Sequence, residues 1–250
     1  MVVLLTLSCS RREPAPKAPV TATPSPVLFA DVTEQMGLTF IHDSGSRGEY
    51  VMPEHIGSGV ALFDYDNDGR LDLYFIQAGG PQSGARNQLY HQEANGTFRN
   101  VSEGSGLDVV GVGMGVTAGD VNNDGLTDLL VTEYGRIRLF LNRGGGHFED
   151  VTEAAGLDDA HWATAASFVD YDRDGWLDLV VGNYVDYYPT MQCFDPAGAR
   201  EFCGPQELPP TVTRLFHNRG SAAGPGKVAF EDATVSSGFA RTKGKVLGIL

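Results

Sequence analysis

The residues best suited to chemistry are aspartates that recur at fixed spacing in three short stretches. The stretches are "DYDNDGRLDLYF" from Asp64, "DVNNDGLTDLLV" from Asp120 and "DYDRDGWLDLVV" from Asp170. In each, oxygen-bearing side chains occupy positions one, three, five and nine. Like charges this close repel one another, so three copies in one register need a shared cause. A calcium ion supplies it, because Ca²⁺ takes about six to eight oxygen ligands in a flexible shell.

The pattern predicts three calcium sites, each with four side chains and the backbone oxygen of position seven. Site 1 comprises Asp64, Asp66, Asp68, Arg70 (backbone O) and Asp72. Site 2 comprises Asp120, Asn122, Asp124, Leu126 (backbone O) and Asp128. Site 3 comprises Asp170, Asp172, Asp174, Trp176 (backbone O) and Asp178. Glycine at position six (Gly69, Gly125, Gly175) permits the sharp turn. Acidic turns without a metal are the alternative.

These loops differ from an EF-hand at their far end. An EF-hand closes with a glutamate at position twelve, whereas these loops have Phe75, Val131 and Val181 there. A strand–loop–strand calcium site fits this pattern, and Mg²⁺ fits less well because it demands a rigid octahedron. Since Asn122 offers an oxygen without a charge, we expect site 2 to bind most weakly.

The segments around the loops are predicted to form short strands. In the first unit, "VALF" enters the loop, "LDLYFI" leaves it, and "QLYHQ" and "TFRNV" flank the turn "EANG". The loops begin 56 and then 50 residues apart. Four strands per unit at this period predict an all-β fold, a β-propeller built of four-stranded blades. Helix is expected at most as a turn in "TEQMGL" or "TEAAGL".

Longer phrases repeat with the loops. "FADVTEQMGL" from Phe29 returns as "FRNVSEGSGL", "FEDVTEAAGL" and "FEDATVSSGF". The final "KVLGIL" aligns with "GSGVAL", which precedes the first loop. We therefore expect about three complete blades plus the start of a fourth, in a chain that is a fragment of a longer propeller.

The overall charge argues against nucleic acid as a partner. The formal net charge is −14, and phosphate binding needs a basic face. Eleven of the 32 acidic residues lie in the three loops, and three divalent ions would bring −14 to −8. Much of the acidity is thus predicted to be metal-site charge.

The N-terminus predicts a location outside the cytoplasmic membrane. Residues 1–9 resemble the end of a bacterial lipoprotein signal with Cys9 as the lipidation site, although Thr6 stands where Leu is usual. Residues 10–26 form a Pro-rich tether, and residues 27–250 hold the propeller repeats. We expect an extracytoplasmic protein, either lipid-anchored to a bacterial (outer) membrane or secreted, whose only contact with the membrane is the lipid. The alternative is an apolar terminus with an incidental cysteine.

Cys193 and Cys203 flank a Gly- and Pro-containing stretch. In an oxidising compartment they are expected to form a disulfide that staples this loop. Two free thiols are the alternative.

The chain resembles the FG-GAP/VCBS type of β-propeller repeat and, more closely, the N-terminal part of the ASPIC/UnbV group, which includes the cartilage acidic proteins. The resemblance runs from about Phe29 to Leu250 and rests on "MPEHIGSGVALFDYDNDGRLDLYF", "LFLNRGGGHFEDVTEAAGL" and "VGNYVDYYP". It implies a calcium-loaded propeller, typically seven-bladed, with a separate C-terminal domain that this sequence lacks. It also implies a binding or adhesion role.

The function expected is that of a calcium-binding extracytoplasmic surface protein, a binding or adhesion module for a protein or glycan. The alternative is a non-catalytic propeller part of a larger secreted enzyme or assembly. We do not expect an enzyme, because the six histidines are scattered and no nucleophile or zinc pattern is apparent. Tyr184, Tyr187 and Tyr188 either form an exposed aromatic patch or pack internally.

Overall fold

The computed structural model describes residues 29–224 and 227–249. The chain divides into two units, Met1–Val32 and Thr33–Leu250, and the fold below is that of the second unit. The predicted signal (residues 1–9), the lipidation site Cys9 and the tether (residues 10–26) lie outside the described residues. Within the described ranges, no helix has the length and apolar character needed to cross a membrane.

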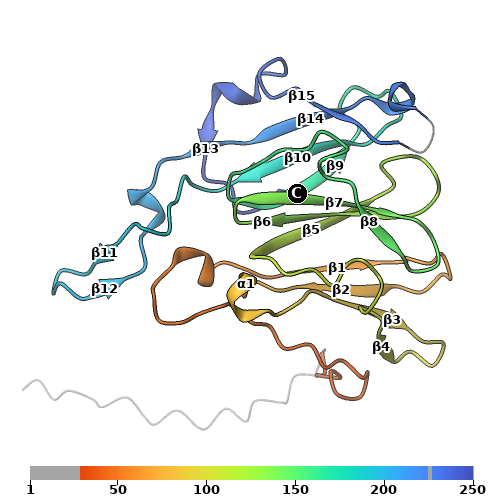
Figure 1. Cartoon of the computed structure of the whole chain (residues 1–250), viewed down its shortest axis with the longest axis horizontal. Helices are drawn as coiled ribbons and strands as arrows, with labels where there is room; N and C mark the ends of the chain where they lie inside the picture. Colours follow the sequence, from red (N-terminus) through yellow and green to blue (C-terminus); the bar gives the residue numbers. More distant parts are fainter. Residues whose placement is uncertain (1–28, 225–226, 250) are drawn as a thin grey trace, which may run out of the picture. The chain divides into compact units, whose positions relative to one another are not determined.

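Three four-stranded antiparallel sheets make up most of the structure (Figure 1). The first contains β1 (Gly59–Phe63), β2 (Asp72–Ile76), β3 (Gln88–Gln92) and β4 (Phe98–Asn100). The second contains β5 (Gly113–Gly119), β6 (Asp128–Glu133), β7 (Arg136–Asn142) and β8 (Phe148–Asp150). The third contains β9 (Ala163–Val169), β10 (Asp178–Asn183), β14 (Arg214–Asn218) and β15 (Phe230–Asp232). Within each sheet the strands lie side by side in the order in which they occur in the chain, as in propeller blades, so the predicted fold class is confirmed.

The remaining elements are short. The helical ones are α1 (Gly80–Ser83) and the 3₁₀ turns Met52–Glu54, Pro205–Glu207, Gly220–Ala223 and Phe239–Arg241. Two small ribbons are β11 (Cys193–Phe194) with β12 (Arg200–Glu201), and β13 (Thr211–Val212) with β16 (Lys243–Gly244). Beyond β16, Val246 donates its N–H to Asn183 O over 3.2 Å. The segment aligned with the entry to the first loop therefore lies against the third sheet.

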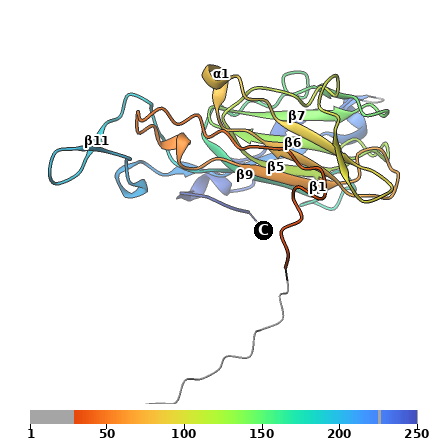
Figure 2. The ribbon, with the colours of Figure 1, turned by 90° about the horizontal axis from the view of Figure 1, so that it is seen from below.

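The three sheets stack face to face, with β5 beside β1 on one side and β9 on the other (Figures 1 and 2). Side chains such as Ile76, Leu89 and Phe140 form the core around the first two sheets. Leu139, Leu179 and Phe216 belong to the core around the second and third. Because the second sheet lies between two others, every residue of β6 is buried. This burial explains why the apolar residues of β6, Leu129 to Val131, are consecutive rather than alternating.

The repeated phrase "TEQMGL", "SEGSGL" or "TEAAGL" forms a turn that accepts a hydrogen bond from the outer strand of one sheet. The second and third copies also follow the outer strand of the preceding sheet and so join each sheet to the next. Phe98 N donates to Met36 O, Phe148 N to Ser105 O, and Phe230 N to Ala155 O, over 2.7–2.8 Å. The phrase forms hydrogen-bonded turns and not helices.

Glycine is required in this turn for space and conformation. Gly106 has φ +83°, and a Cβ placed there would lie 2.1 Å from Phe148 O. The sequence repeat is thus explained by the close approach of two backbones.

Candidate metal sites

Each aspartate loop connects the first and second strands of its sheet. The loops run over residues 64–71, 120–127 and 170–177, and the aspartate at position nine is the first residue of the following strand. That aspartate pairs with the residue immediately before the loop, as Asp72 does with Phe63. The strand pairing therefore closes the loop and fixes where its ends lie.

The first aspartate organises the backbone of each loop. In loop 1, Asp68 N donates to Asp64 Oδ1 over 3.1 Å, and Gly69 N donates to Asp64 Oδ2 over 2.8 Å. Asp120 accepts the same two bonds in loop 2, and Asp170 accepts them in loop 3. The N–H of position seven donates to the carboxylate of position five over 2.9 Å in all three loops.

Two positions per loop have left-handed backbone. Position six is glycine with φ between +83° and +90° (Gly69, Gly125, Gly175). Position four also has positive φ, at Asn67, Asn123 and Arg173. A Cβ at any of the three glycines would meet nothing within 4 Å. Glycine is therefore favoured here by the left-handed backbone conformation and not by lack of space.

The aspartate at position nine is fully buried in each loop (Asp72, Asp128, Asp178). Its Oδ2 accepts the N–H of position two, over 3.0–3.2 Å. Its Oδ1 accepts a backbone N–H from the third strand of the sheet, over 2.8 Å. These carboxylates are thus held rigidly at the inner end of each loop.

Burial raises the pKa of all three position-nine carboxyls. The increase is large at Asp128, to about 7, where the charges of Asp124 and Asp120 add to the desolvation. At Asp72 and Asp178 the pKa is also raised by burial, while His91 and His217 act to lower it. A buried carboxylate of this kind is stabilised by a cation.

The structure brings several of the predicted ligands close together. Ligand atoms of Asp64, Asp66 and Asp72 lie within 4.8 Å of one another, as do those of Asp170, Asp172 and Asp174. In loop 2, Asn122 stands at position three and donates through Nδ2 to Asp124 Oδ2 over 2.9 Å. The backbone oxygens of Arg70, Leu126 and Trp176 stay predictions as ligands.

Sequence reasoning missed two histidines beside the loops. His91 of β3 and His217 of β14 face loops 1 and 3, whereas Leu141 occupies the same register of β7. The signal was present in "LYHQ" and "LFHNRG", which align with "LFLNRG". Their role depends on strand register, which the linear spacing of the acidic residues does not reveal.

Sequence reasoning also missed hydrogen bonds that link successive loops. Asn67 Nδ2 donates to Gly125 O and Asn123 Nδ2 donates to Gly175 O, both over 3.0 Å. Asn142 Nδ2 donates to Tyr65 O over 2.8 Å, and Asn218 Nδ2 donates to Val121 O over 2.9 Å. The three loops consequently form one connected edge of the stacked sheets.

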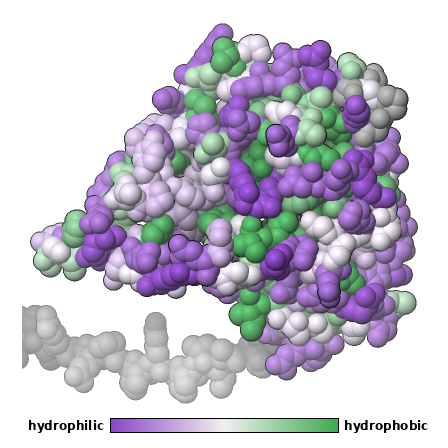
Figure 3. Space-filling view, in the orientation of Figure 1, coloured by the Kyte–Doolittle hydropathy of each residue, from purple (hydrophilic) through white to green (hydrophobic). Residues whose placement is uncertain are grey.

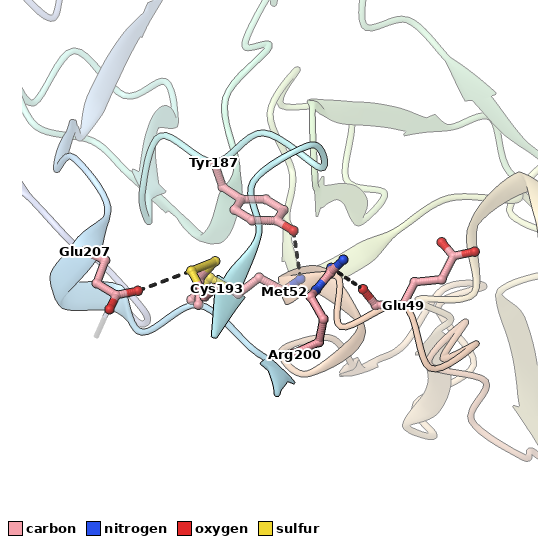
Figure 4. Close-up of a disulfide and its surroundings, with 7 residues drawn as sticks. Glu49, Met52, Tyr187, Cys193, Arg200 and Glu207 are labelled. Atoms are coloured by element: carbon pink, nitrogen blue, oxygen red, sulfur yellow. Dashed lines mark hydrogen bonds between the residues drawn. A yellow bond between two sulfur atoms is a disulfide. The ribbon is translucent and has the colours of Figure 1, made fainter. Parts of the chain in front are cut away.

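A separate feature is the loop that carries the two cysteines (Figure 4). Cys193 and Cys203 form a disulfide across β11 and β12, and the carboxylate of Glu207 lies 3.2 Å from Cys193 Sγ. Arg200 Nη2 donates to Glu49 O over 2.9 Å, and Met52 N donates to the Tyr187 hydroxyl over 3.1 Å. The stapled loop is thereby tied to the segment that precedes β1.

Comparison with known proteins identifies the class of repeat. The FG-GAP-like repeat matches residues 64–131 and 120–181. Each match begins at the first aspartate of one loop and ends in the strand that follows the next loop. The chain therefore carries an FG-GAP repeat domain, and its sheets are the blades of that β-propeller class. No curated protein matches the chain.

Proposed function

We propose that this protein is a calcium-binding, extracytoplasmic surface protein whose propeller acts as a binding or adhesion module for a protein or glycan. The observation that carries the proposal is the shared geometry of the three loops. Each has the same backbone hydrogen bonds to positions one, five and nine. In loops 1 and 3, three carboxylates also bring ligand atoms within 4.8 Å of one another. Three copies of one cation-suited arrangement favour Ca²⁺ over unrelated acidic turns.

Calcium would stabilise the edge of the fold at which the loop carboxylates lie close together. Asp72, Asp128 and Asp178 are buried, and burying a carboxylate without a cation is costly. Because the asparagine bonds connect the loops, an ion in one loop also helps to position its neighbour. Metal binding would then contribute directly to the free energy of folding.

An aromatic cleft is the best-suited ligand surface on the described residues. The cleft has a volume of about 520 Å³ and is lined by Tyr134, Trp162, Tyr187 and Tyr188, among others. Tyr187 is buried, whereas Tyr188 is 60% exposed, so the predicted tyrosine patch reduces to Tyr188 at the rim. On the face in Figure 3, apolar groups are small and separated by hydrophilic residues. This pattern favours recognition by a cleft rather than by a broad apolar face.

The finer assignment to the ASPIC/UnbV group is part of this proposal, as is the lipid-anchored or secreted location. The disulfide supports a location outside the cytoplasm, since such bonds persist in oxidising compartments. The motifs around loops 1 and 2 and the "VGNYVDYYP" stretch support the finer grouping.

A calorimetric titration of chelator-treated protein with Ca²⁺ tests the proposal. We expect three equivalents of Ca²⁺ to bind and the melting temperature to rise with calcium concentration. Extracellular calcium modules bind with Kd values of about 10⁻⁴–10⁻³ M, so the titration must reach millimolar calcium. Asp64→Asn, Asp120→Asn and Asp170→Asn should each remove one equivalent. A full chain that binds no calcium, with a melting temperature insensitive to it, would refute the metal role.

A further inference from the structure

We propose that loops 1 and 3, but not loop 2, also accept a nitrogen-preferring divalent cation such as Zn²⁺, with His91 and His217 as ligands. The inference deepens the proposed function, because it rests on the same loops as the calcium sites. By this proposal, loops 1 and 3 have nitrogen and oxygen ligands, whereas loop 2 has oxygen ligands.

In loop 1, the His91 imidazole lies among the predicted calcium ligands. His91 Nδ1 is 3.5 Å from Asp66 Oδ2 and 3.3 Å from Asp72 Oδ1. On its other edge, Nε2 is 3.8 Å from Asp68 Oδ2. When two ligand atoms bind the same tetrahedral Zn²⁺ ion at about 2.0–2.1 Å, they lie about 3.3 Å apart. The nitrogen-to-carboxylate distances in loop 1 therefore match the spacing of ligands around a single ion.

An unsatisfied polar atom points to the same place. His91 is only 8% exposed, and its Nδ1 is buried without a hydrogen-bond partner. A buried polar group normally has a partner, and a cation held between the imidazole nitrogen and the two carboxylates would supply one. The acidic cluster alone would not carry this conclusion.

Loop 3 repeats the arrangement on another sheet. His217 is less buried than His91, and its Nδ1 shares a hydrogen bond with Asp178 Oδ1 over 3.1 Å. The same nitrogen is 3.5 Å from Asp172 Oδ2. These aspartates hold positions three and nine, as Asp66 and Asp72 do in loop 1. One imidazole and two carboxylates thus lie together in both loops, because His91 and His217 occupy the same register in their sheets.

Loop 2 provides a natural contrast. Leu141 occupies the histidine register and is buried in the core, and Asn122 replaces the aspartate at position three. Loop 2 keeps only oxygen ligands, which suit calcium. An imidazole with carboxylates instead suits later first-row metals, which bind nitrogen ligands more strongly than calcium does.

The test is a Zn²⁺ titration of the metal-free full chain, followed by competition with Ca²⁺. We expect two equivalents of Zn²⁺ for the wild type, displaced by excess Ca²⁺. His91→Leu and His217→Leu should each lose one equivalent of Zn²⁺ and keep all three of Ca²⁺. Leucine is the residue that loop 2 already has at this register, so folding should survive, and the retained calcium stoichiometry verifies it.

The exposed histidine His147 supplies the matched control, and His147→Leu should keep both equivalents of Zn²⁺. Mn²⁺ bound in place of Zn²⁺ should show a ¹⁴N coupling by pulsed electron paramagnetic resonance. The coupling should disappear in the His91→Leu/His217→Leu double variant.

Zinc binding by the histidines and calcium binding by the loops can be refuted separately. Zn²⁺ binding that is unchanged in both histidine variants, with three calcium ions still bound, overturns the nitrogen site and leaves the proposed function intact. Histidine-dependent Zn²⁺ binding in a chain that takes no calcium supports the inference and refutes the proposed calcium role.

Discussion

At the scale of single residues, loop 2 differs from its neighbours in ligand charge. Asn122 contributes an oxygen without charge, whereas Asp66 and Asp172 hold this position in the other loops. Calcium affinity depends on the number of charged ligands. Site 2 is therefore expected to be the weakest of the three.

Asn122→Asp should raise the calcium affinity of site 2 toward that of sites 1 and 3. Calorimetry on the variant should show the weakest of the three binding steps become tighter. Asn95→Asp, in the turn between β3 and β4, makes the same charge change away from the loops and should leave all three steps unchanged. A site 2 that is already as tight as the others in the wild type would contradict the account.

The buried carboxyl of Asp128 makes the metal-free protein sensitive to pH. Burial raises its pKa from 3.8 to about 7, so the folded state binds a proton more tightly than the unfolded state. The free energy of unfolding of the metal-free protein should therefore fall as pH rises from about 4 to about 7. Asp128→Asn removes this group and should flatten that part of the profile.

Thermal melts of the chelator-treated wild type and Asp128→Asn between pH 5 and pH 8 measure the effect. The wild type should lose more stability than the variant over this interval. Parallel profiles for the two proteins would show that Asp128 does not titrate in the interval. With calcium bound, the wild type should no longer lose stability as pH rises, because the ion keeps the carboxylate charged.

At the scale of elements, side-chain amides hold one sheet to the next. Asn142 at the end of β7 is fully buried and donates to Tyr65 O and Thr127 O. Asn218 repeats this arrangement at the end of β14. The two asparagines link the metal loops of successive sheets.

Asn142→Ala should destabilise the protein by about 1–3 kcal/mol for each buried carbonyl left without a donor. It should also weaken calcium binding at loop 1, because Tyr65 lies in that loop. Gln92→Ala, at the same register of the first sheet, is the matched control and should have a smaller effect in denaturant unfolding. Equal effects of the two substitutions would argue against the link between sheets.

The second glycine of the "SEGSGL" turn, Gly106, should be sensitive to substitution for steric reasons. Gly104 and Gly106 both have positive φ, so alanine is conformationally strained at either position. A Cβ at Gly106 meets Phe148 O, whereas one at Gly104 meets nothing within 4 Å. Gly106→Ala should therefore cost about 1–3 kcal/mol more than Gly104→Ala in denaturant unfolding. Similar costs would show that the close approach of the two backbones is unimportant.

The strands and the acidic loops could be predicted because their signals are local. Runs such as "LDLYFI" between turn residues indicate strands, and the aspartates of one site lie within nine residues. His91 and Asn142 escaped prediction because they reach the loops from a third strand, 19 and 14 residues beyond the position-nine aspartates Asp72 and Asp128. Only the pairing register of the sheet brings them there. The sequence predicted no more than a turn at "TEQMGL", and the structure has a hydrogen-bonded turn there.

At the scale of the whole molecule, the three loops form one edge whose stability is expected to depend on calcium. The sheets share two apolar cores, and hydrogen bonds join each acidic loop to the next. Each ion present at about 100 times its Kd would add about 2.7 kcal/mol to the free energy of unfolding. Calcium should accordingly stabilise the stacked sheets together rather than one sheet alone.

The most direct test is a crystal structure of the full chain grown with calcium, with anomalous difference density used to locate the ions. We expect three peaks, one inside each aspartate loop, with the side chains of positions one, three, five and nine as ligands. Loops without anomalous density at saturating calcium, or calcium bound only outside them, would contradict the central claim.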